Sequence, residues 1–542
     1  MENKEEKVVL AASDKVVHFN LPEWDKAIAD GLKKSPLYTL SSKQAVLKNS
    51  ADMVMLDRSI TTNGWDMVSI CRVSALNAKI RADKSYPASI DEEDYAPISL
   101  KGDFDAWQVV TGGDGRNVKL NIPMANGYFH GANMGSGEIF DVTGVSVDVL
   151  VKLQYFPLVS KDTKMDPNDY NLSVKTDSDS KSDPIVAVIN IDDPSGKIDP
   201  INLSILKGQF DMWLNKPDNL KKFNTIFATV MINQMGDIPE EFRWLIPSYT
   251  SYAYTDLGSE ESSIFGVLCM TNEADPSQLP NQLPAISLEA ENNALFILSR
   301  EALVREQILP NLPLVFEGST SDDFSVDDTG LIITAKNIKL DSVRYGLIDY
   351  YPELKHFEIA FDENFIMSTS KIDTEISPGI VCHTTIVTKQ TLYMDYNDKG
   401  EKIMAYKELE EAQVNNDVEV APGIIITEII LGIIGAVIAL IAAAIGGLVA
   451  FIVVGIIVLL VVGAIAAIIH GIIAKVIADG IKEAMPSIDP MVKVAAGQVK
   501  WPFCCKEGLD LTDIVYAGSI TAVGNLDIEE QFQLQNGRLI CA

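Results

Sequence analysis

Residues 429–474 read IILGIIGAVIALIAAAIGGLVAFIVVGIIVLLVVGAIAAIIHGIIA, a run without a single Asp, Glu, Lys or Arg. The rest of the chain is acidic, and the 542 residues carry a net charge of -31. Apolar surface of this extent must be removed from water by lipid, by the protein itself or by a bound apolar ligand. The way in which the run is buried therefore decides both the fold and the function of the chain.

The run predicts one long helix, about residues 425–485, although Ile and Val favour strands by propensity. It contains no Pro or Asn-Gly turn signal, and it is far too long for one strand. Glu428 precedes it and Lys475 follows it, and these charges suit the two ends of a helix dipole. A helix that is apolar on all sides is buried in a protein core or in a membrane.

Small side chains recur along this predicted helix on one i±4 row, where another backbone can approach closely. This close-packing stripe consists of Gly447, Gly455, Gly463 and Gly471. We expect large apolar side chains elsewhere on the helix to face a lipid or another apolar ligand. The candidate lipid-facing residues are Ile441, Leu448, Phe451, Ile452 and Leu459.

A membrane hairpin is the alternative reading of the same run. A break at Gly446-Gly447 would give two spans of about 17 and about 22 residues, which is enough to cross a bilayer. The flanks, however, show no excess of Lys and Arg and no Trp or Tyr at an interface. We therefore favour a helix that is wrapped by its own protein, and the membrane-inserting or pore-forming hairpin stays open.

Most of the remaining chain has the pattern of strands. The segment DVTGVSVDVLVKLQYFP, residues 141–157, alternates polar and apolar side chains, as a half-buried strand does. Turn signals stand at 377–379, which reads SPG, and at 397–400, which reads NDKG. The expected class is α+β, with long, highly curved antiparallel sheets wrapped around the long apolar helix.

The chain is predicted to consist of an N-terminal extension, 1–59, with one or two helices, and one domain, 60–542. Within the domain, residues 160–200 are rich in Asp, Ser and Pro and predict a polar insertion loop. The segment SREALVREQILP, residues 299–310, predicts a short helix that begins after Ser299 as N-cap and ends at Pro310.

The charge of the chain argues against nucleic acid as a partner, because phosphate binding needs clustered Lys and Arg. The first residues, MENKEEKVVLAASDK, lack an apolar core, so we expect no signal peptide. Synthesis in the cytoplasm follows, with any release or secretion by a route other than the Sec system.

Motifs of catalysis and of metal binding are missing from the sequence. The five His and six Cys have no spacing typical of a metal site, and no Gly-x-Ser-x-Gly elbow is present. The sequence therefore gives no support for an enzyme, for catalytic residues or for a cofactor.

Eight longer segments stand out in their order along the chain. They are NGWDMVSICRVSALNAKI (63–80), GGDGRNVKLNIPM (112–124), WLIPSYTSYAY (244–254), FGVLCMT (265–271), ALFILSREALVREQILPNLP (294–313), ISPGI (376–380), KWPF (500–503) and YAGSITAVG (516–524). In this order, from about residue 60 to 540, they resemble the clostridial P-forty-seven protein family, which is encoded beside botulinum-type neurotoxins and related insecticidal toxins.

The resemblance implies membership of the tubular lipid-binding (TULIP) superfamily. In that fold a curved antiparallel sheet wraps around a long helix, and the space between them can hold lipid without a catalytic centre. The sequence thus predicts a non-enzymatic, lipid-binding accessory protein of a bacterial toxin system. Two alternatives stay open: a membrane-inserting component, and a structural partner that binds another protein of the toxin gene cluster.

Overall fold

The structure is a computed structural model of the chain, and its dominant element is antiparallel sheet. It describes residues 17–19, 59–131, 138–157, 169–176, 184–232, 238, 240–271, 275–284, 286, 288, 291–316, 318–424, 428–450, 452, 487–504, 509–526, 532–535 and 538–541. Every strand pair within these ranges is antiparallel, which confirms the prediction of large antiparallel sheets.

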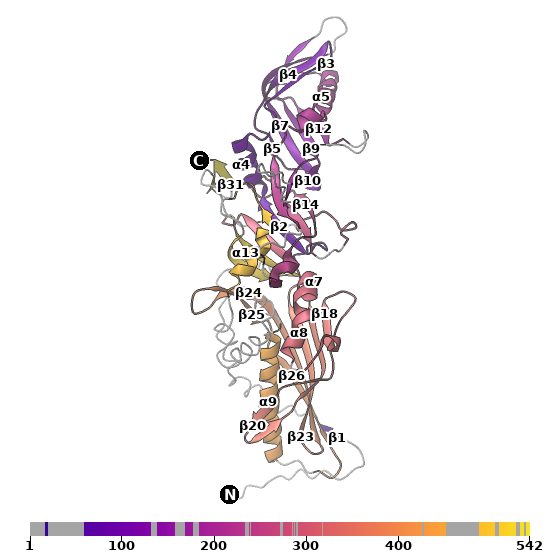
Figure 1. Cartoon of the computed structure of the whole chain (residues 1–542), viewed down its shortest axis with the longest axis vertical. Helices are drawn as coiled ribbons and strands as arrows, with labels where there is room; N and C mark the ends of the chain where they lie inside the picture. Colours follow the sequence, from indigo (N-terminus) through magenta and orange to yellow (C-terminus); the bar gives the residue numbers. More distant parts are fainter. Residues whose placement is uncertain are drawn as a thin grey trace.

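The molecule is a rod in which sheets follow one another along the long axis (Figure 1). One end holds a seven-stranded sheet, which we call the upper sheet. A sixteen-stranded sheet runs from the middle to the other end. We call its middle part the central strands (β28, β29, β16, β2, β15 and β14) and its far part the lower sheet (β17, β18 and β22 to β26).

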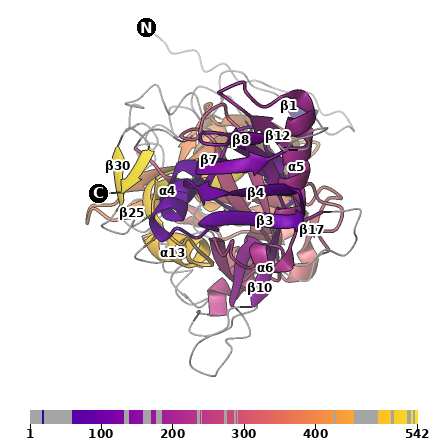
Figure 2. The same ribbon diagram turned by 90° about the horizontal axis from the view of Figure 1, so that it is seen from above.

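The upper sheet has the strand order β12-β9-β7-β4-β3, with β5 and β8 paired to β7. Figure 2 shows β3, β4 and β7 side by side, with α5 along one edge and α4 toward the opposite side. The bounds are β3 Ser89–Tyr95, β4 Ile98–Phe104, β5 Gln108–Val109, β7 Val118–His130, β8 Ile139–Asp141, β9 Ser146–Val151, β12 Val186–Asp192, α4 Val73–Asp83, α5 Pro200–Leu214 and α6 Pro217–Leu220.

A four-stranded sheet and the central strands occupy the middle of the rod. The four strands are β10 Leu153–Pro157, β11 Asp169–Val174, β13 Ile226–Met231 and β27 Val499–Lys500. The central strands and their neighbours are β2 Met67–Arg72, β6 Asp114–Gly115, β14 Tyr249–Thr255, β15 Ile264–Met270, β16 Ala294–Ser299, β28 Asp510–Tyr516 and β29 Ser519–Asn525. The flanking helices are η1 Glu240–Leu245 and α13 Asp489–Gly497.

The lower sheet contains the longest strand of the described chain, β24, which runs from Ile380 to Tyr396. The other strands are β17 Phe324–Val326, β18 Ile332–Ala335, β19 Ile338–Lys339, β22 Glu353–Phe361, β23 Ile366–Ser377, β25 Lys402–Glu408 and β26 Gln413–Val420. Two separate hairpins are β20 Val343–Tyr345 with β21 Ile348–Tyr350, and β30 Phe532–Gln535 with β31 Arg538–Cys541.

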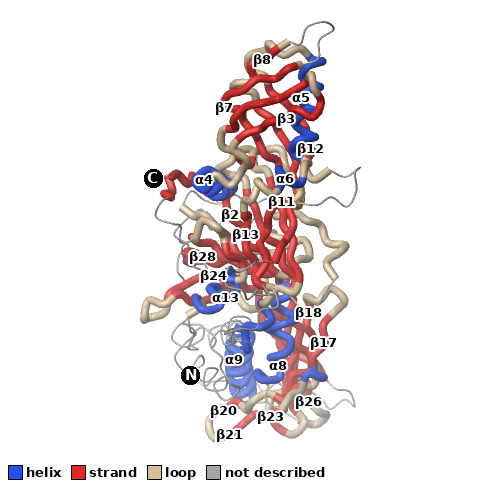
Figure 3. Tube along the Cα trace, turned by 45° about the horizontal axis from the view of Figure 1, so that its top comes forward, coloured by secondary structure: helices blue, strands red, loops and turns tan. Residues whose placement is uncertain are grey.

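Two helical segments lie beside the lower sheet (Figure 3). The first is continuous from α7 (Arg300–Leu303) through the π-helical turn η2 (Val304–Ile308) to α8 (Leu309–Val315), and η3 (Ser321–Asp323) follows it. The second is α9, which is described from Glu428 to Ala450 and lies within the predicted helix of about 425–485. The predicted continuation of this helix to about residue 485 lies outside the described residues, apart from Ile452.

The predicted helix at 299–310 begins correctly but does not end at Pro310. The Ser299 hydroxyl accepts a hydrogen bond from the Ala302 N–H at 3.0 Å, as an N-cap does. The π-helical turn η2 then interrupts the α-helical ladder, and Pro310 stands in the first turn of α8, where its missing N–H is tolerated. The helix therefore continues to Val315.

The predicted insertion loop at 160–200 is also wrong in part. Two strands, β11 and β12, lie inside this range, and they pair with β10 and β9. Partner strands outweigh a local composition that is typical of loops. In the predicted extension 1–59, three residues, Val17–Phe19, form strand β1 on the edge of β26; the predicted helices there lie outside the described residues.

Candidate functional site

The described part of α9 is buried along one stripe, although its sequence is apolar all round. Ile434, Val437, Ile438 and Ile441 are all 0% exposed, whereas Ile429 is 77% exposed. The spacing of three and four residues is that of one helix face. This stripe is the surface that α9 presents to the lower sheet.

At one end of α9, the helix packs against apolar side chains of the lower sheet. Ile434 and Ile438 pack in one cluster with Ile380 and Cys382 of β24 and with Val418 of β26. Side chains two residues apart on a strand share a face, so the even-numbered positions of β23, β24 and β26 all belong to this face. We call it the helix-facing surface.

Further along, the helix-facing surface becomes polar. Its buried members on β23 are Ser368, Ser370 and Thr374, and those on β24 are Thr384, Thr388 and Gln390. Asn416 of β26 stands opposite Thr384 in the register, and Thr374 stands opposite Cys382. Because the three strands are adjacent, these side chains form one patch, which we call the polar patch.

Several atoms of the polar patch have no hydrogen-bond partner within the described part of the chain. They are Ser370 Oγ, Thr374 Oγ1, Gln390 Nε2 and both side-chain polar atoms of Asn416. A buried polar group without a partner costs about 1–3 kcal/mol, and native proteins contain few of them. Their concentration on one surface, opposite an apolar helix, makes this surface the candidate site for an amphiphilic ligand.

Two patch hydroxyls do satisfy each other. Ser368 Oγ and Thr388 Oγ1 lie 2.7 Å apart on neighbouring strands. Ser368 and Ser370 therefore differ in hydrogen bonding although they lie on the same face of the same strand. The pair gives an internal control for the energetics of the patch.

Charged side chains on these strands lie on the opposite face. His383 is bracketed there by Asp373 on β23, with Nδ1 2.6 Å from Oδ1, and by Glu419 on β26, with Nε2 3.3 Å from Oε2. Partial burial lowers the pKa of His383, but the hydrogen bonds and charges of Asp373 and Glu419 outweigh it and raise the pKa above its ordinary value. The helix-facing surface of β23, β24 and β26 carries no charged side chain at its even positions.

The upper sheet encloses an interior of a different kind. Trp107 and Trp213 pack with Phe104, at ring-centroid distances of 5.5 and 5.6 Å, and the Phe223 ring packs at a tilt against Trp107 with centroids 5.0 Å apart. A cavity of about 10 Å³ is lined by Trp107, Trp213 and Phe223 together with aliphatic side chains such as Val149. This volume suits one water molecule at most. Aromatic and aliphatic side chains thus fill the interior of the upper half.

At the two ends of β2, Asp66 and Arg72 are buried polar side chains that are hydrogen-bonded and structural. Asp66 is 2% exposed and accepts hydrogen bonds from the N–H and hydroxyl of Thr271, at 2.8 and 3.0 Å. The second oxygen of Asp66 pairs with Arg305 at 3.1 Å. Arg72 donates to three backbone carbonyl oxygens in the segments 261–292, and its burial lowers its pKa.

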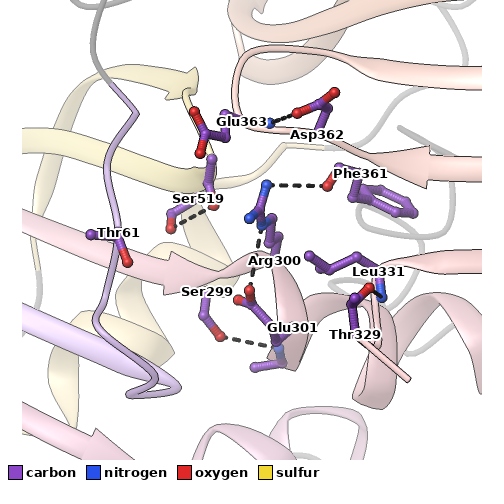
Figure 4. Close-up of polar contacts among 12 residues, drawn as sticks. Thr61, Ser299, Arg300, Glu301, Thr329, Leu331, Phe361, Asp362, Glu363 and Ser519 are labelled. Carbon is purple, nitrogen blue, oxygen red and sulfur yellow. Dashed lines mark hydrogen bonds and ion pairs between the residues drawn. The ribbon is translucent and has the colours of Figure 1, made fainter. Parts of the chain in front are cut away.

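The junction between the central strands and the lower sheet is a second bonded network (Figure 4). Arg300 donates to the Phe361 carbonyl oxygen at 3.2 Å, and the Tyr516 hydroxyl donates to that of Asp362 at 2.7 Å. Ser519 Oγ donates to the Ile60 carbonyl oxygen at 2.8 Å. Most segments that carry the family resemblance lie in this junction and in the central strands. The resemblance therefore rests mainly on the part of the chain that joins the upper sheet to the lower sheet.

The residues named from the sequence are only partly described. Ile441 and Ile452 are 0% exposed and belong to the main core, and their role in lipid contact stays a prediction. Gly447 and Leu448 lie within the bounds of α9, but the structure does not describe their side chains. The others, Phe451, Leu459, Gly455, Gly463 and Gly471, lie outside the described residues.

The polar patch is the feature that sequence reasoning missed. Its signal is present in IMSTSKIDTEIS, residues 366–377, where Ser and Thr occupy both faces of a predicted strand. A strand that covers a protein core normally has one face that is apolar throughout. The departure from that pattern is what could have directed attention to β23.

Comparison with known proteins gives a consistent result. A family model described as OrfX-like, Protein OrfX2/OrfX3/P47, matches residues 62–524. Protein OrfX3 of Paraclostridium bifermentans is 27% identical over 396 residues, which cover 66% of this chain and 78% of that protein. Protein P47 of Clostridium botulinum (strain Kyoto / Type A2) is 21% identical over 320 residues, covering 56% of this chain and 70% of that protein.

Solved structures agree in fold. P47 from Clostridium botulinum A2 superposes with a TM-score of 0.57 at 17% identity, covering 86% of this chain and 98% of that chain. P47 of Clostridium botulinum E1 superposes with a TM-score of 0.56, also at 17% identity, covering 87% of this chain and 100% of that chain. No name among these relatives is that of an enzyme.

Within the ranges that the structure describes, no helix combines the length and the hydropathy needed to cross a membrane.

Proposed function

Because the chain belongs to the OrfX-like family of OrfX2, OrfX3 and P47 proteins, we propose that it is a non-enzymatic accessory component of a bacterial toxin system that binds an amphiphilic, lipid-like ligand. We place the ligand between α9 and the helix-facing surface of the lower sheet. The observation that supports this proposal is the polar patch, which is buried opposite an apolar helix and contains atoms without partners in the described chain.

The chemistry of the two surfaces defines the class of ligand. The stripe of α9 offers only aliphatic side chains, which contribute about 25 cal/mol per Å² of apolar area removed from water. The polar patch offers hydroxyl and amide groups and no charge. A ligand with an acyl chain and uncharged polar groups, such as esters, hydroxyls or amides, matches both surfaces.

The first experiment is to purify the full chain from its expression host and to identify extracted lipid by mass spectrometry. We expect a lipid that survives purification and that fluorescent acyl-chain analogues displace. A protein that carries no lipid and takes up no analogue would overturn the proposal, and would leave the structural-partner alternative in its place.

The second experiment asks whether the polar patch holds the ligand. Thr374→Val keeps the side-chain shape and removes a hydroxyl that is 1% exposed and without a described partner. We expect weaker uptake of the fluorescent analogue, by about threefold to tenfold, since one hydrogen bond contributes about 0.5–1.5 kcal/mol. The matched control is Thr521→Val on β29, because Thr521 Oγ1 is equally buried and unpartnered but lies in the central strands.

The membrane-inserting alternative makes a different prediction. Insertion would require α9 to leave the lower sheet, and with it the packing of Ile434 and Ile438 on Cys382 and Val418. Leakage of liposomes at any pH, together with a change in the circular dichroism spectrum of the protein, would favour this alternative over ligand binding.

A further inference from the structure

The hairpin of β20 and β21 carries a concentration of exposed apolar side chains. Leu347 is 98% exposed, Tyr351 72%, Ile348 56% and Tyr345 42%. Exposed apolar residues that occur singly need no explanation, but contiguous ones mark interaction sites. Here four of them fall within seven residues of one hairpin and the residue that follows it.

The local geometry presents Leu347 at the point of the hairpin. Tyr345 pairs with Ile348 in the register, so Gly346 and Leu347 form a two-residue turn. Gly346 has a φ of +65°, as the first position of such a tight turn requires, and Leu347 then projects from the end. We call the segment from Arg344 to Tyr351 the apolar tip.

The apolar tip is fixed and electrically neutral. Arg344 and Asp349 stand opposite each other and form two hydrogen bonds, Nε to Oδ1 at 2.6 Å and Nη2 to Oδ2 at 2.7 Å. They are the only charged residues from 343 to 351. The paired charges lie behind the turn, so Leu347 and Ile348 can enter an apolar phase while both ions stay at its surface.

The tip stands at the end of the rod, as Figures 1 and 3 show. β20 packs against α9, and Val343 lies against the main core together with Val437 and Ile441 of α9. The hairpin is therefore anchored to the body at one side and free to meet another surface at the other.

We propose that the apolar tip docks the protein on the surface of a lipid bilayer that carries no net charge, such as one of phosphatidylcholine. A projecting Leu with Tyr rings behind it matches the layered polarity of a bilayer, in which aliphatic groups lie deeper and Tyr rings lie at the interface. The net charge of -31 disfavours anionic lipid, and the neutral tip has no charge with which to bind it.

A membrane surface suits this feature better than a protein partner does. The tip is a narrow, convex projection with four apolar side chains, whereas a stable protein interface needs about 800 Å² on each partner. A bilayer has no shape to match and accepts a small projection. In the docked protein, the lower sheet would face the lipid. The ligand site that we propose there would then lie near the membrane.

The test is flotation of the full chain with phosphatidylcholine vesicles. We expect the unmodified protein to float and Leu347→Asp to reduce the bound fraction by at least about tenfold, because a carboxylate is strongly disfavoured in the apolar layer. The matched control is Ile201→Asp, since Ile201 is 71% exposed but lies in α5 at the upper sheet. We expect this control to float like the unmodified protein.

A second measurement follows the tip directly. Leu347→Trp places an indole at a position that is 98% exposed, so the substitution leaves the packing of the body unchanged. The fluorescence of the new indole is obtained by subtracting the emission spectrum of the unmodified protein from that of the variant. We expect this difference spectrum to shift to shorter wavelength when vesicles are added. No flotation of the unmodified protein, flotation of Leu347→Asp equal to that of the control, or an unshifted emission would each overturn the proposal.

A protein partner at the tip would give a different result. Self-association that depends on concentration in analytical ultracentrifugation and disappears in Leu347→Asp, without flotation, would assign the tip to a second copy and overturn the lipid docking. The docking rests on the apolar tip alone, so its outcome is distinguishable from that of ligand binding. Extracted lipid in a protein that does not float would retain the proposed function and reject the docking.

Discussion

The upper and lower sheets each pack a long helix against antiparallel strands, but their interiors are built from different chemistry. Under α5, aromatic rings such as Trp107 and Trp213 pack with aliphatic side chains of the sheet and leave a cavity of about 10 Å³. Under α9, aliphatic side chains meet a surface with buried hydroxyl and amide groups. The same architecture thus serves one half as a closed core and the other as a candidate ligand site.

The helices also differ in how they treat the polar groups of their sheets. On α5, Asp211 accepts from the Val188 N–H at 2.9 Å, and the C-cap residue Asn215 donates to the Val186 carbonyl oxygen at 2.7 Å. The described residues of α9 after Glu428 have no polar side chain with which to do the same. The apolar helix α9 cannot form hydrogen bonds with the polar side chains of the sheet beneath it. A bound ligand could form them instead.

The largest expected effect sharpens the view that the upper half is a closed core. Trp213→Ala removes a side chain that is 3% exposed and packs on Phe104. We expect the free energy of unfolding to fall by about 3–5 kcal/mol, since the loss of transfer energy adds to a cavity cost. Urea unfolding followed by circular dichroism measures it, and a loss below about 1 kcal/mol would contradict the closed core.

The next effect concerns a polar group of the upper half that is satisfied. Asn77 of α4 is 0% exposed and bonds both backbone groups of Val109, with Nδ2 2.8 Å from the carbonyl oxygen and Oδ1 2.7 Å from the nitrogen. Asn77→Ala leaves both groups buried without a partner, so we expect a loss of about 2–4 kcal/mol in unfolding free energy. Asn126→Ala, at an exposed position of β7, is the control and should cost less than about 0.5 kcal/mol.

The polar patch should respond with the opposite sign. Ser370→Ala removes a buried hydroxyl without a described partner, so we expect the unfolding free energy of the delipidated protein to rise by about 1 kcal/mol. Ser368→Ala on the same strand should instead lower it by about 1 kcal/mol, because Thr388 loses its partner. Equal losses in both variants would remove the contrast between the two halves.

Local signals in the sequence were enough to predict much of the lower sheet. The turns at 377–379 and 397–400 occur where they were predicted, and Gly379 and Gly400 have φ of +81° and +77°. At these positions the backbone needs a residue without Cβ, and that requirement is readable from the sequence. A helix that includes Glu428–Ala450 was likewise predictable, because it depends on a local change of composition.

The faces of the strands could not be assigned from the sequence. Thr369 and Ser370 are chemically alike neighbours, yet Ser370 is 0% exposed and Thr369 is half-buried on the other side. Which of them faces the helix depends on register with β22 and β24, and hence on partners distant in sequence. The strands β11 and β12 were missed for the same reason, since long-range pairing stabilises them within a polar segment.

The smallest effect that we predict lies on the outer face of the lower sheet, where His383 meets Asp373 and Glu419. These carboxylates raise the pKa of His383 in the folded chain above its unfolded value near 6.5. The stabilisation is therefore fully present below about pH 6.5 and is lost as pH rises through the raised pKa. His383→Gln should lower the unfolding free energy at pH 6 by less than about 1 kcal/mol, since the group is partly exposed, and by less at pH 9. His356→Gln on β22, with Glu358 at 3.8 Å, is the control, and an equal pH dependence in both variants would show that the outer-face pair does not contribute.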